Sequence, residues 1–382
     1  MKGDSILLGA VAAAILAIPA AAILWSGQPL IVQAAAPVAP EKNISQSSGA
    51  SQPMVFSPPA SSGTSPEASG AGMQGVSQPD QDEKPRQEAP ETALGYRTKI
   101  TSFKILNRST GVVAVVPVEE YVRGAIAAEM PADYHLEALK AQGVAALSYA
   151  FYEAEAQRTN PDPELGGADF AADPENRKGY MTEAVAREFY GDGFDVAWAR
   201  LTEAAQAVDD LVMLYDGEPI AAAYHAISAG LTEDAENIWG APLPYLTTTD
   251  SQWDILAAGY KSTATFSQEE MKGLLEGAGA ILPLDPTGWI TVKERSPAGY
   301  VTKVQVGDQE MTGNQLRNLL GLRSSYFEMI PSGNKFVFEV KGYGHGAGLS
   351  QNGADYLARQ GKNFQQILLH YYTGATLAKL EK

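Results

Sequence analysis

The chain has 382 residues, a formal net charge of −17, no cysteine and only 4 histidines. The acidic balance argues against a nucleic-acid partner, because phosphate binding requires clustered lysine and arginine, and it argues equally against docking on anionic lipid. The absence of cysteine excludes disulfides, thiolate zinc sites and a lipid-modified cysteine anchor.

The chain opens with an apolar stretch. All 20 residues from Ile6 to Trp25 are apolar, glycine or proline, which is about the length that spans a bilayer as a helix. Residues 1–36 are therefore predicted to form an N-terminal transmembrane anchor. This anchor would place the protein in the cell membrane as a single-pass protein with an extracytoplasmic C-terminal domain. Cleavage as a signal segment, after the run Ala34 to Ala36, is the competing interpretation.

A segment poor in apolar residues follows. Residues 37–93 contain nine prolines, ten serines and a single aromatic residue, Phe56. Such a composition cannot bury enough apolar surface to offset the entropy of ordering the chain. We therefore predict a disordered linker over this range.

The remaining residues, 94–382, hold most of the aromatic residues and are predicted to form one compact domain. Its predicted fold class is α+β, because strands and helices do not alternate regularly. Short β-branched runs predict strands over residues 99–106, 111–116, 212–215, 220–224, 300–306 and 336–340. Apolar residues at helical spacing predict helices after residue 117 and over residues 134–157, 182–190, 195–208, 267–276, 312–319 and 363–372.

Glu129 is the most informative residue. It continues the apolar face of the helix that starts after Pro117, and Pro131 follows two positions later. A proline disfavours the α conformation of the preceding residue, so the helix should end here with the carboxylate beside unpaired carbonyl groups. Both this position and partial burial would raise the pKa of the carboxyl group and favour a neutral acid that can donate a proton. A solvated glutamate at a helix end is the alternative.

Three separated motifs resemble those of the stage II sporulation protein D family. The first runs from Val118 to Tyr149 and contains the triplet Glu-Met-Pro, the second from Tyr224 to Leu246, and the third from Gly342 to Ala354. Together they cover about residues 95–376 in the family's order. The resemblance implies a lytic transglycosylase that acts on peptidoglycan, with Glu129 as its catalytic acid.

The resemblance also implies substrate-binding positions, each with a structural alternative. Lys140 could be a solvated helix lysine, Tyr149 a core ring and His225 a structural histidine. The glycine-rich stretch around His345 could serve only to fix a turn. The chain departs from the family at Leu147, where arginine is frequent, and at Ala229, where glycine is frequent. The implied substrate-binding residues are Lys140, Gln142, Tyr149, His225, Ser228, His345, Ser350 and Gln351.

No metal and no other cofactor are expected. Some family members carry histidine and cysteine zinc ligands after the second helix, but the matching stretch here, residues 168–180, contains neither. Asp169, Asp173 and Glu175 could hold a hard cation, although a solvated acidic loop is the preferred interpretation.

The function implied by the resemblance is cleavage of peptidoglycan glycan strands, stripped of their peptides, to 1,6-anhydromuramic products during endospore formation and engulfment. Its implied partners are the glycan strands, a peptide-removing amidase and sporulation membrane proteins. The alternative is a non-catalytic cell-wall-binding protein that enhances an amidase. The intact triplet around Glu129 favours the enzyme.

Overall fold

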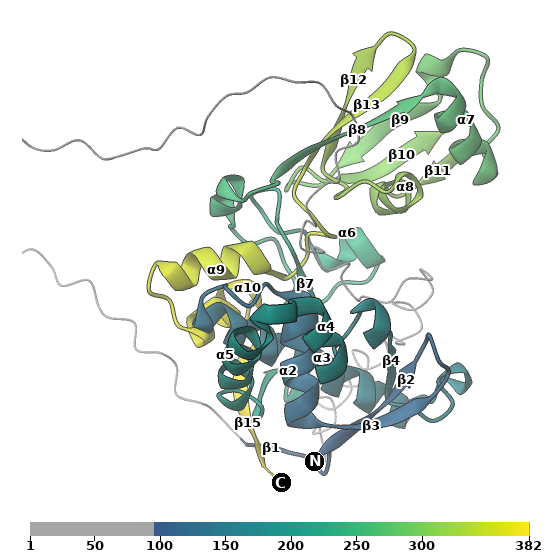
Figure 1. Ribbon diagram of the computed structural model, residues 1–382. Coiled ribbons are helices and arrows are strands. Elements are labelled where there is room, and N and C mark those ends of the chain that lie inside the picture. The colour runs from purple at the N-terminus through teal and green to yellow at the C-terminus, as the bar shows by residue number, and fades with distance from the viewer. Residues whose placement is uncertain (1–94, 382) are drawn as a thin grey trace, which may run out of the picture. The chain divides into compact units, whose positions relative to one another are not determined.

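A computed structural model describes residues 95–381 (Figure 1). A three-stranded sheet opens the fold, in the order β3-β2-β4. β2 (Ser102–Asn107) pairs antiparallel with β3 (Val113–Pro117) and parallel with β4 (Phe170–Ala172). The alternation of β2 buries Phe103 and Ile105 completely or nearly so, which fixes the register of the sheet on the core.

Two helices follow this sheet and form the centre of the first hydrophobic core. α2 (Val118–Glu129) ends as predicted, because Met130 adopts an extended conformation before Pro131, with φ −126° and ψ 144°. α3 (Leu136–Thr159) starts after His135, whose ring accepts a hydrogen bond from the backbone N–H of Glu137 at 3.3 Å. α3 contacts α2, α5, α9 and α10, so it is apolar nearly all round rather than along one stripe.

Further helices and a second sheet complete the first core. The sheet has the order β1-β15-β5-β6, so the first and last described strands pair in parallel. A two-residue turn joins β5 to β6, since Asp216 and Gly217 both have positive φ, as a type I′ hairpin turn requires. These elements are β1 (Gly95–Arg97), α4 (Glu183–Tyr190), α5 (Phe194–Gln206), β5 (Leu211–Tyr215), β6 (Glu218–Pro219), α6 (Ala235–Trp239), α9 (Gln351–Arg359), α10 (Phe364–Tyr371) and β15 (Thr376–Glu381).

A second hydrophobic core lies between the second and third sequence motifs. Two three-stranded antiparallel sheets, β12-β13-β8 and β11-β10-β9, enclose Trp289, Phe327 and Phe338 (Figure 1). The elements are β8 (Lys261–Ser267), α7 (Gln268–Gly277), β9 (Ile290–Arg295), β10 (Val301–Val306), β11 (Gln309–Met311), α8 (Gly313–Leu320), β12 (Phe327–Ser332) and β13 (Lys335–Lys341). Short 3-10 helices are η1 (Pro163–Leu165), η2 (Pro174–Asn176), η3 (Gly191–Gly193), η4 (Gln252–Leu256) and η5 (Pro286–Gly288).

The chain leaves the first core and returns to it through two adjacent short strands. β7 (Tyr224–His225) pairs in parallel with β14 (Leu349–Ser350). The second and third motifs are therefore side by side although more than one hundred positions separate these two strands. A hydrogen bond from the Ser296 hydroxyl to the Glu233 carboxylate links the segment between these strands back to the second motif.

The mixed composition of helices and strands confirms the predicted class in the described part of the chain. The predicted strand over residues 220–224 is wrong except at its end. Ala222 and Ala223 donate to carbonyl groups only two residues earlier, and Ala221 donates to the Tyr245 hydroxyl. The N–H groups of this buried apolar run are thus satisfied partly by neighbouring carbonyl groups and partly by a tyrosine hydroxyl, and no ladder forms before Tyr224.

The predicted location as a single-pass cell-membrane protein is corrected. No helix within residues 95–381 combines the length and the apolar character needed to cross a bilayer. The predicted anchor, residues 1–36, and the predicted linker, residues 37–93, lie outside the described residues.

Candidate active site

Glu129 is the last residue of α2, and its side chain is buried with 3% of its surface exposed. Burial raises the pKa of this carboxyl group to about 8, while the nearby Gln351 amide acts in the opposite direction. Neither carboxyl oxygen has a hydrogen-bond partner of normal geometry. The group is therefore held mainly as a neutral acid at neutral pH.

Two glutamine side chains lie beside this carboxyl group. Gln351 Nε2 donates to Gln142 Oε1 at 3.3 Å, and both residues are buried. Gln142 belongs to α3 and Gln351 is the first residue of α9, so the contact joins the first sequence motif to the third. The structure thus brings together three of the predicted site residues.

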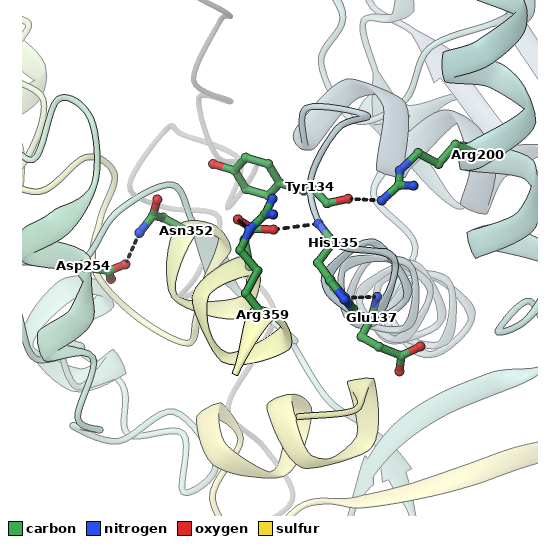
Figure 2. Close-up of polar contacts among 8 residues, drawn as sticks. Tyr134, His135, Glu137, Arg200, Asp254, Asn352 and Arg359 are labelled. Carbon is green, nitrogen blue, oxygen red and sulfur yellow. Dashed lines mark hydrogen bonds and ion pairs between the residues drawn. The ribbon is translucent and has the colours of Figure 1, made fainter. Parts of the chain in front are cut away.

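α9 is held against the start of α3 by polar contacts around Asp355. Figure 2 shows His135 and Arg359, which take part in these contacts. The Asp355 carboxylate accepts a hydrogen bond from the backbone N–H of His135 at 2.6 Å and forms an ion pair with Arg359 at 2.7 Å. Asn352 donates to Asp254 at 3.0 Å, as Figure 2 also shows. These contacts hold the N-terminal half of α9 and therefore the backbone of Gln351.

Two tyrosines that the sequence analysis did not select also lie near Glu129. The buried Tyr224 and Tyr121 have pKa values raised first by burial and next by the Glu129 carboxylate, so both hydroxyls are within its electrostatic reach. The Gln142 side chain, next to the Tyr224 hydroxyl, partly offsets this rise in the pKa. Tyr121 was read as part of an apolar helix face. Tyr224 precedes the more conspicuous His225.

Tyr149 lies on α3. Together with Tyr121 and Tyr224 it lines a small cavity. Its pKa is raised well above the usual value by burial and by the neighbouring Glu153 carboxylate. Glu153 is itself largely buried, which raises its pKa, and a hydrogen bond with Tyr149 acts in the opposite direction. The sequence analysis did not select Glu153.

His225 and His345 form a buried pair whose ring centroids are 5.8 Å apart. The Ala347 peptide contacts both rings: its carbonyl oxygen lies 3.0 Å from His225 Nδ1, and its N–H donates to His345 Nδ1 at 3.1 Å. Burial lowers the pKa of His225 to about 4 and that of His345 well below its usual value. Both rings are therefore neutral at pH 7. Since adjacent strand residues face opposite sides, His225 points away from the side on which Tyr224 faces Glu129.

The remaining predicted site residues make local contacts. Ser350 caps α9 by accepting a hydrogen bond from the Gly353 N–H at 3.2 Å. Ser228 accepts one from the Gly230 N–H at 3.1 Å. Lys140 forms an ion pair with Glu137 at 2.7 Å. These three side chains are thus placed by structural interactions rather than by contact with Glu129.

The acidic loop after α3 uses its carboxylates in hydrogen bonds. Asp173 accepts from the Ser109 hydroxyl at 2.6 Å, and Glu175 accepts from the Asn107 amide at 2.9 Å. Asp169 accepts from the backbone N–H of Lys104 at 2.7 Å. Within residues 95–381, no group of three or more histidine, aspartate or glutamate side chains is placed to hold a metal ion.

Comparisons with known proteins give the family. The family model described as "Stage II sporulation protein" matches residues 107–215. Stage II sporulation protein D of Bacillus subtilis (strain 168) is 30% identical over 302 residues, which cover 78% of this chain and 84% of that protein. The chain belongs to the stage II sporulation protein family. The family predicted from the three motifs is thereby confirmed, and the protein is related to sporulation.

Other relatives extend the comparison of this sporulation-family protein. Stage II sporulation protein D of Bacillus amyloliquefaciens is 32% identical over 294 residues, with 77% of this chain and 80% of that protein covered. A B. subtilis (strain 168) protein named "Amidase enhancer" is 27% identical over 309 residues, with 67% of this chain and 40% of that protein covered. The matched family segment contains Glu129, Gln142 and Tyr149, whereas Tyr224 and Gln351 lie beyond it.

Proposed function

We propose that this protein is a lytic transglycosylase that cleaves the glycan strands of peptidoglycan, with Glu129 as its acid and base. The observation that carries the proposal is a buried carboxyl group with a pKa of about 8 at the end of α2. At pH 7 such a group is mainly protonated. It is therefore ready to donate a proton to a leaving glycosidic oxygen.

The proposed reaction needs one carboxyl group. Glu129 protonates the glycosidic oxygen as the bond to the muramic acid residue breaks. The resulting carboxylate then takes the proton from the C6 hydroxyl of the same sugar, whose oxygen closes a 1,6-anhydro ring on C1. The proton lost by Glu129 in the first step is replaced in the second, and no water is consumed.

Hydrolysis would instead require a second carboxylate about 5–10 Å from the acid. Glu233 is a buried carboxylate of the second motif, but it accepts hydrogen bonds from the Asn237 amide at 2.8 Å, from the Asp234 N–H at 2.9 Å and from the Ser296 hydroxyl. These three hydrogen bonds give the Glu233 carboxylate a structural role. This favours a reaction in which Glu129 is the only carboxyl group that takes part.

The carboxyl oxygens of Glu129 are covered in this conformation. Proton donation to a sugar requires them to be uncovered. Gln351 lies beside the carboxyl group and contacts Gln142, and a change of the Gln351 side-chain rotamer would expose the acid while the backbone of α9 stays held by Asn352 and Asp355. The covered state also keeps water from the acid, which suits a reaction that consumes none.

Membership of the sporulation family and the relative named amidase enhancer support a role in the same process as the removal of peptides from peptidoglycan. We propose that the substrate is glycan already stripped of its peptides by an amidase, because unsubstituted lactyl groups leave the strand slim enough to enter a covered site. The amidase is then the proposed partner in endospore formation.

A second candidate function is enhancement of an amidase without catalysis. Two observations favour it: the relative of that name and the covered state of Glu129. In that case the three motifs would bind glycan only, and the acid would never be uncovered.

The test is mass spectrometry of peptide-free glycan strands incubated with the unmodified protein and with Glu129→Gln. The proposal predicts anhydromuramic ends from the unmodified protein alone. Reducing ends would indicate hydrolysis. Binding by both proteins with cleavage by neither would establish the non-catalytic function.

A further inference from the structure

Asp355 joins α9 to the segment that follows the acid. It lies four residues after Gln351, so the two side chains share one face of α9. Gln351 contacts Gln142 in the middle of α3, and Asp355 accepts from the His135 N–H just before α3. Among residues 95–381, Gln351 and Asp355 are the two α9 side chains with hydrogen bonds to α2, α3 or the loop between them.

The loop between α2 and α3, residues 130–135, is held from two sides. Figure 2 shows Arg200 of α5 donating to the Tyr134 carbonyl oxygen, at 2.7 Å. On the other side, the His135 N–H donates to Asp355 at 2.6 Å. Since Arg200 already fixes the loop on α5, the Asp355 contact sets the position of α9 relative to the loop. Glu129 directly precedes this loop.

The contact between Asp355 and His135 is of a strong kind. A hydrogen bond from a backbone N–H to a carboxylate is about twice as strong as one between neutral groups. The Asp355 side chain is only 15% exposed, so water competes little for it. Its carboxylate also lies at the N-terminus of α3, where the helix dipole favours an anion. A role limited to capping α3 is the simplest alternative, and it would affect stability alone.

We propose that Asp355 is a positioning residue for the acid: by holding α9 against the loop after α2, it keeps Gln351 beside the Glu129 carboxyl group and keeps water from that group. Asp355 acts through α9 and takes no part in proton transfer. The inference rests on the proposed function in taking Glu129 as the acid. Asp355 was not among the site residues predicted from the sequence.

The charge of Asp355 does not itself set the protonation of the acid. Burial raises the pKa of Glu129 and the Gln351 amide lowers it, and these are its two causes. The Asp355 charge acts instead on the Tyr134 ring. The charged groups around that ring are Asp355, Asp133, Asp254 and Arg359. A change in the Glu129 pKa after removal of Asp355 would therefore report a movement of α9 and not a lost charge.

The experiment follows the titration of Glu129 by NMR in the full chain, labelled with carbon-13 at the glutamate side-chain carboxyl groups. Glu129 should titrate near pH 8, and Glu129→Gln identifies its signal by removing it. Asp355→Ala should lower the pKa of Glu129 by about one pH unit or more, because water enters as α9 loosens and burial is the main cause of the raised value. Asp355→Asn keeps an acceptor oxygen for the His135 N–H and should restore the parent value.

A second pair of variants removes the donor instead of the acceptor. His135 has φ −58°, a value that proline adopts. His135→Pro and His135→Ala both lose the ring that caps α3, but only the proline variant loses the N–H that Asp355 accepts. The proline variant should lower the pKa of Glu129 as Asp355→Ala does, and the alanine variant should not. Arg359→Gln, which removes only the ion pair of Asp355, should also leave the pKa unchanged.

The positioning role is refuted if Asp355→Ala and His135→Pro lose stability but keep the parent pKa of Glu129, since Asp355 would then only cap α3. It is also refuted if His135→Ala or Arg359→Gln lowers this pKa as much as Asp355→Ala does. The titration needs no substrate. Failure of the proposed reaction is seen separately, as absence of glycan cleavage by the unmodified protein.

Discussion

Gln351 donates a hydrogen bond to Gln142 across 209 positions of the sequence, and the bond is 3.3 Å long. It joins the first residue of α9 to the middle of α3 directly beside the Glu129 carboxyl group. The first and third sequence motifs therefore meet at one titratable group. Several outcomes follow from the burial of that group.

Glu129→Gln should make stability less dependent on pH. The carboxyl group has a folded-state pKa of about 8 and an ordinary value of 4.5. The folded state binds this proton more tightly than the unfolded state does. The stability that proton binding contributes is therefore complete below pH 4.5 and is lost as the pH rises to about 8. The full loss corresponds to roughly 5 kcal/mol at most.

Thermal unfolding of the two proteins between pH 5 and pH 9 measures this effect. The variant should unfold at a higher temperature than the unmodified protein at pH 8.5, and the difference should narrow toward pH 5. Glu188→Gln, an exposed change on α4, should leave the pH profile as it is. If the unfolding temperature changed with pH in the same way in all three proteins, Glu129 would be solvated.

The pH dependence of cleavage should report the same group. The acid must be protonated, so kcat/KM should fall about tenfold per pH unit above pH 8. Gln351→Ala removes the amide that lowers the pKa of Glu129, so this falling limb should move to higher pH. A limb that stays in place would show that Gln351 does not act on the acid, and a limb that moves to lower pH would show that Gln351 acts mainly by keeping water away from the carboxyl group.

Gly348→Ala should unfold or displace the third motif. Gly348 has φ +69°, and an added Cβ would overlap the Ala223 carbonyl oxygen. We expect a loss of at least about 3 kcal/mol of stability, measured by denaturant unfolding. Gly361→Ala is the control, because Gly361 also has positive φ (+85°) but nothing lies within 4 Å of an added Cβ. It should cost only about 1–2 kcal/mol, and equal losses would contradict the close contact.

Lys140→Met should have a small effect on the reaction. Its ammonium group is paired with Glu137 at 2.7 Å, and the two side chains are about one fifth exposed. Loss of such a pair should reduce stability by about 1 kcal/mol or less and leave KM within twofold. A tenfold rise in KM at unchanged stability would instead place Lys140 on the substrate, as the family resemblance implies.

The helix bearing the acid was predictable because its determinants are local. Pro117 precedes its first turn, apolar residues follow at helical spacing, and Pro131 sets its end. The same holds for α10, which begins with a local capping box between Asn363 and Gln366. Helices with such signals were placed to within two residues at each end.

The neighbours of the acid were less predictable because they depend on contacts distant in sequence. Neither Tyr121 nor Tyr224 was predicted as a site residue, and the packing of β7 against β14 places Tyr224 near Glu129. β8 was missed since its sequence, Lys-Ser-Thr-Ala-Thr-Phe-Ser, contains one large apolar residue. Its strand conformation comes from pairing with β13.

The most direct test of the central claim is cleavage of peptide-free glycan strands in water enriched in oxygen-18. Because the C6 hydroxyl of the sugar replaces water in the proposed reaction, the new ends should be anhydro ends without the label, and Glu129→Gln should produce none. Incorporation of one labelled oxygen per cut would contradict the account, since it would show that water attacks the bond and that a second group must activate it.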